Sequence, residues 1–257
     1  MSVTETIDSD GVAELVVHHP PANAYTIADL ARLTELLRSY EHRDEVRVVV
    51  LRAEGKGFCA GGDLKEVQGL PGFEGILGQA RGSQDSSLAI AECAVPVIGC
   101  VHGYCVGVGV LLAGTCDVLI GSTATKFVLA EVDNGATTGG VQALGLLPEK
   151  RMRAAMFTCE PFDIAELHAY GSVYHVEPTV EAAVDRAREV AATVAAKSPR
   201  VVRAMKKSLN NTAARDLRTL YRQELSYTFE LNMLGDASAA RQTFLDRSRA
   251  GYLDEGR

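Results

Sequence analysis

The chain has 257 residues and a formal net charge of −7, with 23% charged and 47% hydrophobic residues. This composition is that of a globular protein with a buried core, and it excludes a disordered, collagenous or disulfide-scaffold chain. The acidic balance argues against a nucleic-acid partner, which would call for a basic face. Neither a membrane-spanning apolar run nor a secretion signal is found in the sequence, so we expect a cytoplasmic protein without a membrane partner.

The six cysteines form no Cys-x-x-Cys pair, and most of them have apolar neighbours in the sequence. Neither a zinc site nor a disulfide framework is therefore expected. We interpret the cysteines as reduced residues that fill the core.

The N-terminal part of the chain alternates between predicted strands and predicted helices. Residues 3–7 and 12–17 flank a Ser-Asp-Gly turn, which is typical of a hairpin. Apolar residues at helical spacing predict a helix over about 27–37. Short β-branched runs indicate further strands covered on both faces at 46–51, 95–101 and 118–120. Long segments between these strands imply parallel connections.

After about Glu149 the pattern becomes helical, apart from a short strand pattern at 173–176. Helices are expected at 151–158, 162–171, 181–197, 199–210, 216–234 and 236–248. No repeat or flexible linker separates the two parts. We therefore expect an α/β core over residues 1–197, followed by a helical region, 198–257, that is not an independent domain.

The first candidate site is the glycine-rich loop 55–64, which directly follows the predicted strand 46–52. Small residues allow the backbone to approach a ligand closely. A helix starting near Asp63 would present free N–H groups to a developing negative charge. The alternative interpretation of this segment is a plain connecting loop.

The second candidate site is the segment 102–110, which follows the predicted strand 95–101. Its G-x-x-x-G-x-G spacing differs from a dinucleotide fingerprint, and no acidic residue ends a second strand about twenty positions further on. The segment indicates a strand-to-helix turn with free amides near Val108, although the glycines could serve packing alone. Two such turns could each direct one N–H at the same carbonyl oxygen and form an oxyanion hole, where one donor contributes on the order of 3 kcal/mol.

The third candidate is Glu131, which stands among apolar residues in the stretch 127–135. Such surroundings could raise the pKa of a carboxyl group into the range suited to general acid/base catalysis. A solvated or capping side chain is the alternative. Asp133 and His102 are possible helpers, although a structural polar role is the simpler interpretation of each.

Together these segments resemble the crotonase (enoyl-CoA hydratase/isomerase) superfamily over about residues 12–210. The resemblance rests on the order and spacing of several blocks: 21–24, 46–51, 57–66, 96–98, 102–104, 107–109, 116–117, 127–131, 195–199 and 206–210. It implies an α/β spiral of ββα units with a C-terminal helical trimerisation region. It also implies a homotrimer or a dimer of trimers. The implied substrate is an acyl-CoA thioester, of which coenzyme A is a part, so no separate cofactor and no metal are expected.

The resemblance also assigns roles to residues of this sequence. The two N–H donors of the oxyanion hole map onto Gly62 and Val108, and the acid/base glutamate maps onto Glu131. Val108 replaces the glycine usual in the family, which narrows the pocket but keeps the N–H. The residues that would hold the nucleotide part of CoA are Lys56, Ala60, Gly61, Asp63 and Leu64, with Phe244 and Arg247 in the C-terminal helix.

The sequence departs from typical hydratases at the second catalytic acid, where it has Leu111. A two-carboxylate hydration is therefore disfavoured. One base suffices to move a proton between carbons, to assist decarboxylation or to activate water against a β-keto group. The loop 135–140 also departs from the proline-glycine-glycine run of hydratases.

Additional blocks are similar to actinobacterial crotonase-like CoA hydrolases that open a steroid-derived ring: 52–55, 92–98, 104–107, 171–173 and 228–232. This similarity favours hydrolytic C–C cleavage of a cyclic β-keto acyl-CoA. The alternatives are an enoyl-CoA hydratase or isomerase of fatty-acid β-oxidation, or a non-catalytic binding protein of the same fold. Residues 69–87 are expected to form a pocket wall, but their pattern does not reveal the acyl group.

Overall fold

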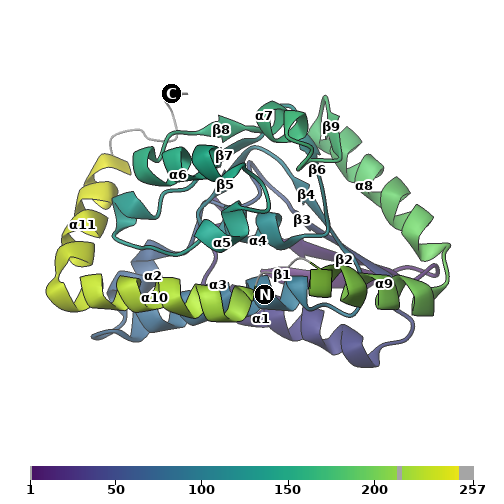
Figure 1. Ribbon diagram of the computed structural model, residues 1–257, viewed down its shortest axis with the longest axis horizontal. Helices are drawn as coiled ribbons and strands as arrows, with labels where there is room; N and C mark the ends of the chain where they lie inside the picture. Colours follow the sequence, from purple (N-terminus) through teal and green to yellow (C-terminus); the bar gives the residue numbers. More distant parts are fainter. Residues whose placement is uncertain (1, 213–215, 249–257) are drawn as a thin grey trace.

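A six-stranded sheet forms the centre of the computed structural model, which describes residues 2–212 and 216–248. The strand order is β1-β2-β3-β4-β6-β9 (Figure 1). β1 and β2 form the expected antiparallel hairpin, and the other neighbouring strands of this sheet are parallel. The strands span Val3–Ile7 (β1), Val12–Val17 (β2), Val48–Ala53 (β3), Val97–Val101 (β4), Val118–Ser122 (β6) and His175–Glu177 (β9).

A second, smaller sheet is built from short strands that follow those of the large sheet. It consists of β5 (Tyr104–Val106), β7 (Lys126–Val128) and β8 (Phe162–Asp163), in that order. Cys59 pairs with Cys105 and so adds the first glycine-rich loop to the same layer. The chain thus repeats one pattern, a strand in the large sheet, a short extended segment in the small one, and then a helix. This is the spiral of ββα units that the resemblance to the crotonase superfamily implies.

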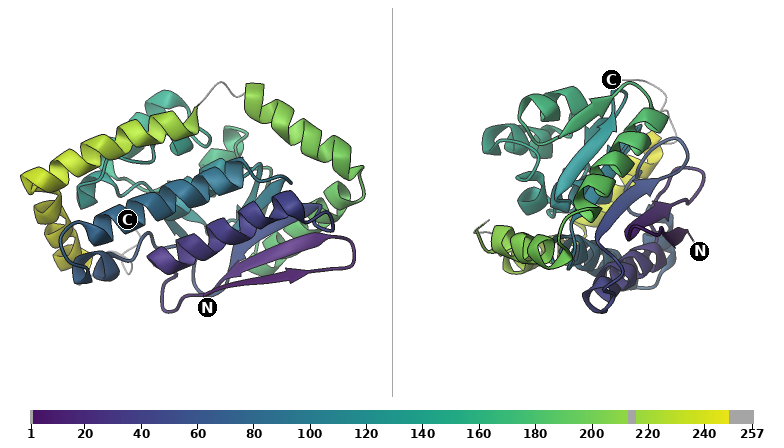
Figure 2. Two further views of the ribbon diagram at one scale, coloured as in Figure 1. Left: turned by 90° about the horizontal axis from the view of Figure 1, so that it is seen from below. Right: turned by 90° about the vertical axis from the view of Figure 1, so that its right-hand side faces the viewer.

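Helices cover both faces of the large sheet (Figures 1 and 2). Ala13 and Leu15 belong to the same core as leucines of α1, whereas Val48 and Val50 pack with the alanine stripe of α8. The β-branched strands are therefore buried on both sides, as their sequence predicts. The helices on these faces are α1 (Ile27–Ser39), α3 (Glu74–Ala91) and α8 (Val180–Ala195).

The remaining helices surround this core. α10 lies against α3, and α11 turns away from its end to lie against η2 (Figure 1). Their bounds are Tyr40–His42 (η1), Leu64–Gly69 (α2), Val108–Thr115 (α4), Val132–Asn134 (η2), Gly140–Ala143 (α5), Glu149–Thr158 (α6), Ile164–Ala169 (α7), Pro199–Thr212 (α9), Leu217–Leu234 (α10) and Asp236–Ser248 (α11). Within the described ranges, no helix is long and apolar enough to cross a membrane.

A buried lysine fastens the C-terminal helices to the α/β part. Lys206 Nζ on α9 donates hydrogen bonds to the carbonyl oxygens of Ile90 and Val95 and forms an ion pair with Asp117 at 2.7 Å. Removing one partner of such a buried pair leaves an uncompensated charge. The division at residue 197 stays a prediction, and these contacts show how closely the two regions are joined.

Two expectations differ from the structure. The predicted helix 162–171 begins instead with the short strand β8, whose Phe162 pairs with Phe127 of β7. The long helix α3 was not expected, because its buried face carries Gly75, Gln79 and Ser83 instead of an apolar stripe. A helix is predicted from apolar residues that recur at helical spacing. A helix whose buried face consists of small and polar residues lacks this signal.

Candidate active site

The small sheet places the two glycine turns side by side. Cys59 N donates to Tyr104 O at 3.2 Å, and Val106 N donates to Cys59 O at 2.8 Å. Gly107 then leaves β5 with a φ of +49°, a conformation that favours glycine. A Cβ on Gly107 would lie 3.9 Å from Gly61 Cα and 3.6 Å from Glu131 Oε1. Gly107 is therefore the point at which the three predicted features of the site meet.

Both predicted oxyanion donors have an N–H group without an acceptor among the described residues. Tyr25 N donates to Gly61 O and Asp63 N donates to Tyr25 O, both at 2.9 Å, so the intervening Gly62 N–H is left unpaired within the described chain. Val108 is the first residue of α4, where an N–H has no acceptor inside the helix. Gly62 and Val108 both line one cavity. Two unpaired amides in such a place can stabilise a developing oxyanion.

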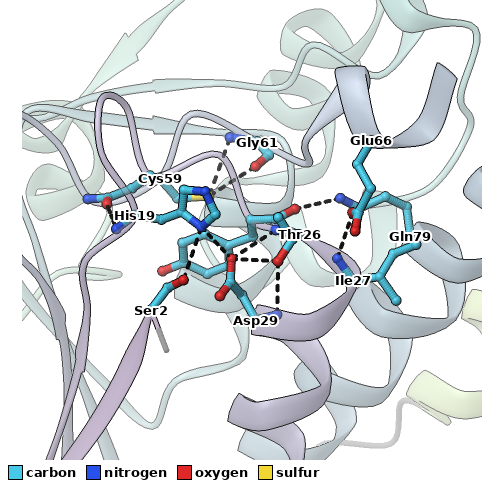
Figure 3. A network of polar contacts seen from close by, with 11 residues as sticks. Ser2, His19, Thr26, Ile27, Asp29, Cys59, Gly61, Glu66 and Gln79 are labelled. Carbon is cyan, nitrogen blue, oxygen red and sulfur yellow. Dashed lines mark hydrogen bonds and ion pairs between the residues drawn. The ribbon is translucent and has the colours of Figure 1, made fainter. Parts of the chain in front are cut away.

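A polar network behind the first turn holds it in place (Figure 3). Gln79 Nε2 on α3 donates to Tyr25 O at 2.5 Å, and Glu66 Oε2 on α2 accepts from Ile27 N at 2.8 Å. A Cβ on Gly62 would lie 2.8 Å from Gln79 Nε2, which leaves no room for a side chain there. The network therefore ties the Gly62 turn to three helices.

Figure 3 also shows a serine, a histidine and an aspartate in contact, but they do not form a catalytic triad. Ser2 Oγ at 3.1 Å and Asp29 Oδ2 at 2.8 Å both contact the same ring atom, His19 Nδ1. A triad needs the nucleophile and the carboxylate on opposite ring nitrogens. Asp29 instead shares a capping box with Thr26 in the first turn of α1, so this cluster is structural.

Glu131 is buried at the start of η2, with 7% of its surface exposed. Its Oε2 atom has no hydrogen-bond partner in the described structure. Burial raises the pKa of Glu131 to about 8; its own backbone N–H opposes this shift and the charge of Glu224 adds to it. A carboxyl group with a pKa near neutrality can both accept and return a proton, as the sequence predicts for this residue.

A second carboxylate, on α10, organises the loop that follows Glu131. Glu224 accepts hydrogen bonds from Gly139 N at 3.0 Å and from Val141 N at 3.1 Å. Thr137 N donates to Thr228 Oγ1 on the same helix at 3.0 Å. Burial raises the pKa of Glu224, and its backbone donors counteract the rise. The loop that departs from the hydratase pattern is therefore bound to α10.

These elements enclose a cleft of about 890 Å³, including its solvent-filled mouth. α3 contributes one wall, as expected for residues 69–87. The lining residues are mainly small and apolar, with a few polar side chains: Gln79, Ser83, Glu131, Asn134, Thr138, Tyr221, Thr228 and Arg241.

The other predicted site residues fall in different places. Ala60, Gly61 and Leu64 line the cleft. Asp63 caps α2 by accepting from Lys65 N at 2.9 Å, and Lys56 is exposed on the loop; neither of them lines the cleft. The side chains of Phe244 and Arg247 lie outside the described residues.

The two possible helpers do not line the cleft. His102 is buried and its Nε2 contacts Gly55 O at 3.0 Å, and burial lowers its pKa. Asp133 is not among the residues that line the cleft. All six cysteines are free, and burial raises the pKa of the Cys59 thiol to about 12, which makes this nearby thiol a poor nucleophile. Within the described ranges, no cluster of metal-ligating side chains is present.

Sequence reasoning missed three polar residues of this region: Gln79, Glu224 and Arg241. Gln79 lies in the unrecognised helix α3. Glu224 and Arg241 belong to predicted helices, but their pattern did not distinguish them from solvated charges. Only their positions in the folded chain show that they belong to the site: Gln79 and Arg241 line the cleft, and Glu224 accepts a hydrogen bond from Gly139 N.

The comparisons with known proteins agree with this geometry. The model of the enoyl-CoA hydratase/isomerase family matches residues 8–255. The chain therefore belongs to the enoyl-CoA hydratase/isomerase family. It is an enzyme of the crotonase superfamily, whose members act on CoA thioesters.

Two similar curated proteins are both named (7aS)-7a-methyl-1,5-dioxo-2,3,5,6,7,7a-hexahydro-1H-indene-carboxyl-CoA hydrolase. The protein from Rhodococcus jostii (strain RHA1) is 38% identical, covering 97% of this chain and 96% of the relative. The protein from Mycobacterium tuberculosis is also 38% identical, covering 96% of this chain and 100% of the relative. Among solved structures, an enoyl-CoA hydratase of Mycobacterium smegmatis superimposes with a TM-score of 0.78 at 27% identity, covering 96% of this chain and 97% of the other.

Proposed function

We propose that this enzyme cleaves a carbon–carbon bond of a cyclic β-keto acyl-CoA by adding water, in a reaction of the type that opens steroid-derived rings. The observation that carries the proposal is the pairing of one buried carboxyl group, Glu131, with two unpaired amides, while Leu111 lies in the wall where hydratases carry a second acid. The names of the two 38% identical relatives support it.

In this mechanism the N–H groups of Gly62 and Val108 bind the thioester oxygen. Glu131, as the carboxylate, takes a proton from water while the water oxygen bonds to the β-keto carbon. The tetrahedral intermediate then collapses to a carboxylic acid. The Cα–Cβ bond breaks, its electron pair forms the thioester enolate, and the two amides stabilise the oxygen charge. Glu131 returns its proton to Cα, so the net reaction adds one water.

Coenzyme A enters in this proposal as part of the substrate, and no separate cofactor is required. Lys56, Ala60, Gly61, Asp63 and Leu64 are proposed to contact its nucleotide part. Lys56 is exposed and suited to a phosphate, so Lys56→Met is expected to raise KM for acyl-CoA with little change in kcat. The roles of Phe244 and Arg247 and the cytoplasmic location stay predictions.

The same family resemblance leads us to propose a homotrimer or a dimer of trimers. Large apolar side chains exposed on the C-terminal helices support assembly: Val201 and Met205 on α9, and Tyr227, Met233 and Leu234 on α10. Sedimentation of the purified protein is expected to give three or six chains per particle. A monomer at micromolar concentration would contradict this proposal.

The test of the reaction uses three CoA esters: crotonyl-CoA, an isomerisable 3-enoyl-CoA and a cyclic β-keto acyl-CoA. We expect the cyclic substrate to gain one water, to keep its CoA, and in oxygen-18-labelled water to carry label in a new carboxylate. Free CoA thiol would instead indicate thioester hydrolysis. If the enzyme hydrates crotonyl-CoA faster than it cleaves the cyclic ester, the hydratase alternative is favoured. If it binds the esters but converts none of them, the non-catalytic alternative is favoured.

A further inference from the structure

Arg241 on α11 is a cation in the wall of the cleft, without an anionic partner among the residues that the structure describes. It lines the cavity together with Asn134, Gly135 and Thr228. No hydrogen bond or ion pair joins its side chain to any described residue. Partial burial lowers the pKa of its guanidinium group, without an opposing carboxylate. An arginine has five donors and is costly to enclose without acceptors.

The other charged residues of the region do not neutralise Arg241. Glu131 is the other charged residue among the described residues that line the cleft, and the two form no ion pair within 4.0 Å. Because the pKa of Glu131 is about 8, its carboxyl group is mostly protonated at neutral pH. Glu224 does not line the cleft, and its oxygens accept from the Gly139 and Val141 amides. Within the described lining of the cleft, the guanidinium group of Arg241 therefore has no carboxylate that pairs with it.

The helix that carries Arg241 is packed against the segment that carries Glu131. α11 packs against η2, and a Cβ on Gly135 would lie only 2.4 Å from Ala237 Cα. This close backbone contact holds the start of α11 against the segment that carries Glu131. Arg241 follows Ala237 by four residues, one helical turn, and so lies on the same side of α11. The cation is therefore placed by the same segment as the base.

We propose that Arg241 binds a carboxylate on the acyl chain of the CoA substrate, either one already present or the one that forms during C–C cleavage. For the carboxylate that forms during cleavage, the inference rests on the proposed function. Hydrolytic cleavage at a β-keto group converts that neutral carbonyl into an anion inside the cleft. Arg241 then holds the charge of the tetrahedral oxygen and of the new carboxylate, by bidentate hydrogen bonds. A purely apolar acyl chain would leave this cation unpaired.

The test measures binding and does not require turnover. Adipyl-CoA is compared with hexanoyl-CoA, and pimelyl-CoA with heptanoyl-CoA, by calorimetry. Each pair differs by a terminal carboxylate, and none of the four has a β-keto group to cleave. We expect the native enzyme to bind the carboxylate-bearing ester at least about tenfold more tightly at one of the two lengths, since charged hydrogen bonds contribute about 1.5–3 kcal/mol.

Arg241→Met is expected to abolish the preference for the carboxylate-bearing ester. Its affinity for hexanoyl-CoA and heptanoyl-CoA should change less than about twofold. Arg241→Lys should retain part of the preference, because lysine keeps the positive charge. The matched control is Arg222→Met, which removes an exposed arginine of α10 and is expected to leave the preference intact. The melting temperature of R241M should not fall, because no hydrogen bond or ion pair of the described residues is lost and the methionine keeps an apolar chain in the partly buried position.

Two results would overturn the inference: a native enzyme that does not distinguish the paired esters, or an R241M protein that still prefers the carboxylate. Either result leaves the proposed reaction standing if the cyclic β-keto ester is still cleaved. Conversely, a failed cleavage assay does not affect a preference that R241M removes. The two proposals can therefore fail separately.

Discussion

Leu111 and Glu131 face each other across Gly139. A Cβ on Gly139 would lie 2.9 Å from Leu111 Cδ1 and 3.5 Å from Glu131 Oε1, so the two side chains meet at the same point of the cleft wall. Leu111 is 2% exposed and belongs to an apolar cluster with Tyr221 and Leu225. The Glu131 carboxyl group thus has a hydrocarbon neighbour where a second acid would give it a charged one. This contact is consistent with burial being the largest cause of its raised pKa.

The first prediction concerns the pH dependence of the reaction. Burial raises the pKa of Glu131 to about 8, and the proposed first step needs the carboxylate. We therefore expect kcat/KM for the cyclic ester to rise with pH and to reach half its plateau near pH 8 in the free enzyme. A profile that is flat between pH 6 and pH 9 would contradict the role of Glu131 as the base.

The second prediction concerns the variant Glu131→Gln. Loss of the base should lower kcat by about 100-fold or more. The same change should stabilise the fold, because a carboxyl whose folded pKa lies above its unfolded value binds more protons in the native state. The stability of the native enzyme then falls as pH rises from about 4.5 towards 8, whereas the glutamine does not titrate.

E131Q should therefore be more stable than the native enzyme by up to about 3 kcal/mol at pH 7, with the gap closing towards pH 4. Thermal unfolding at several pH values measures this. Equal melting temperatures at pH 8 would show that Glu131 is not buried in the native state. Full activity of E131Q would show that another group is the base.

The location of this site could be foreseen because its parts follow strands. The turns at Gly62 and Val108 and the residue Glu131 each lie just after a segment of the β layers, and parallel connections bring such segments to one edge. Glycine composition and strand order were enough to predict that the two turns meet, and the resemblance to the family joined Glu131 to them. The resemblance to the family then added their roles, which remain to be tested.

The rest of the site could not be foreseen from local pattern. Glu224 acts on Gly139, 85 residues away in the sequence, and Arg241 reaches the cleft from the last helix. A charged residue on an amphipathic helix is usually solvated, and only tertiary packing turned these two towards the site. α3 was missed for a related reason, since most of its buried residues are small or polar and only those of its last turn, Leu88, Ala89 and Ile90, are apolar.

The third prediction tests the close approach at Gly107. Gly107→Ala places a methyl group 3.6 Å from Glu131 Oε1, at a φ of +49° that strains alanine. Activity should fall by about 100-fold because relief of this backbone strain shifts the oxyanion turn relative to the base. The control is Gly171→Ala, at a φ of +80° with nothing within 4 Å of the new Cβ. Both variants should lose about 1–3 kcal/mol of stability, and only G107A should lose activity. An active G107A would mean that this turn does not position the reacting groups.

The fourth prediction concerns the missing acid. Leu111→Glu places a second carboxyl group beside Glu131, and like charges raise each other's pKa values, so the pH profile should move to higher pH. The variant should also hydrate crotonyl-CoA, and Leu111→Gln, which has the same shape but no charge, should not. Burying the new group should cost stability, measured for both variants by denaturant unfolding. A folded L111E that hydrates no faster than L111Q would show that the second acid does not limit hydration in this cleft.

The fifth prediction concerns Glu224, which positions the loop and acts on Glu131 through its charge. Glu224→Gln removes that charge and replaces one acceptor of the Gly139 and Val141 amides with a donor. The pKa of Glu131 should fall, because the charge of Glu224 contributes to its rise, so half-maximal kcat/KM should occur at a lower pH than in the native enzyme. The lost hydrogen bond should also cost about 1–3 kcal/mol of stability. Glu230→Gln, an exposed change on the same helix, is expected to alter neither property. If E224Q loses stability but its pH profile of kcat/KM is unchanged, Glu224 has only a structural role. Loop packing alone does not change the electrostatic field at Glu131.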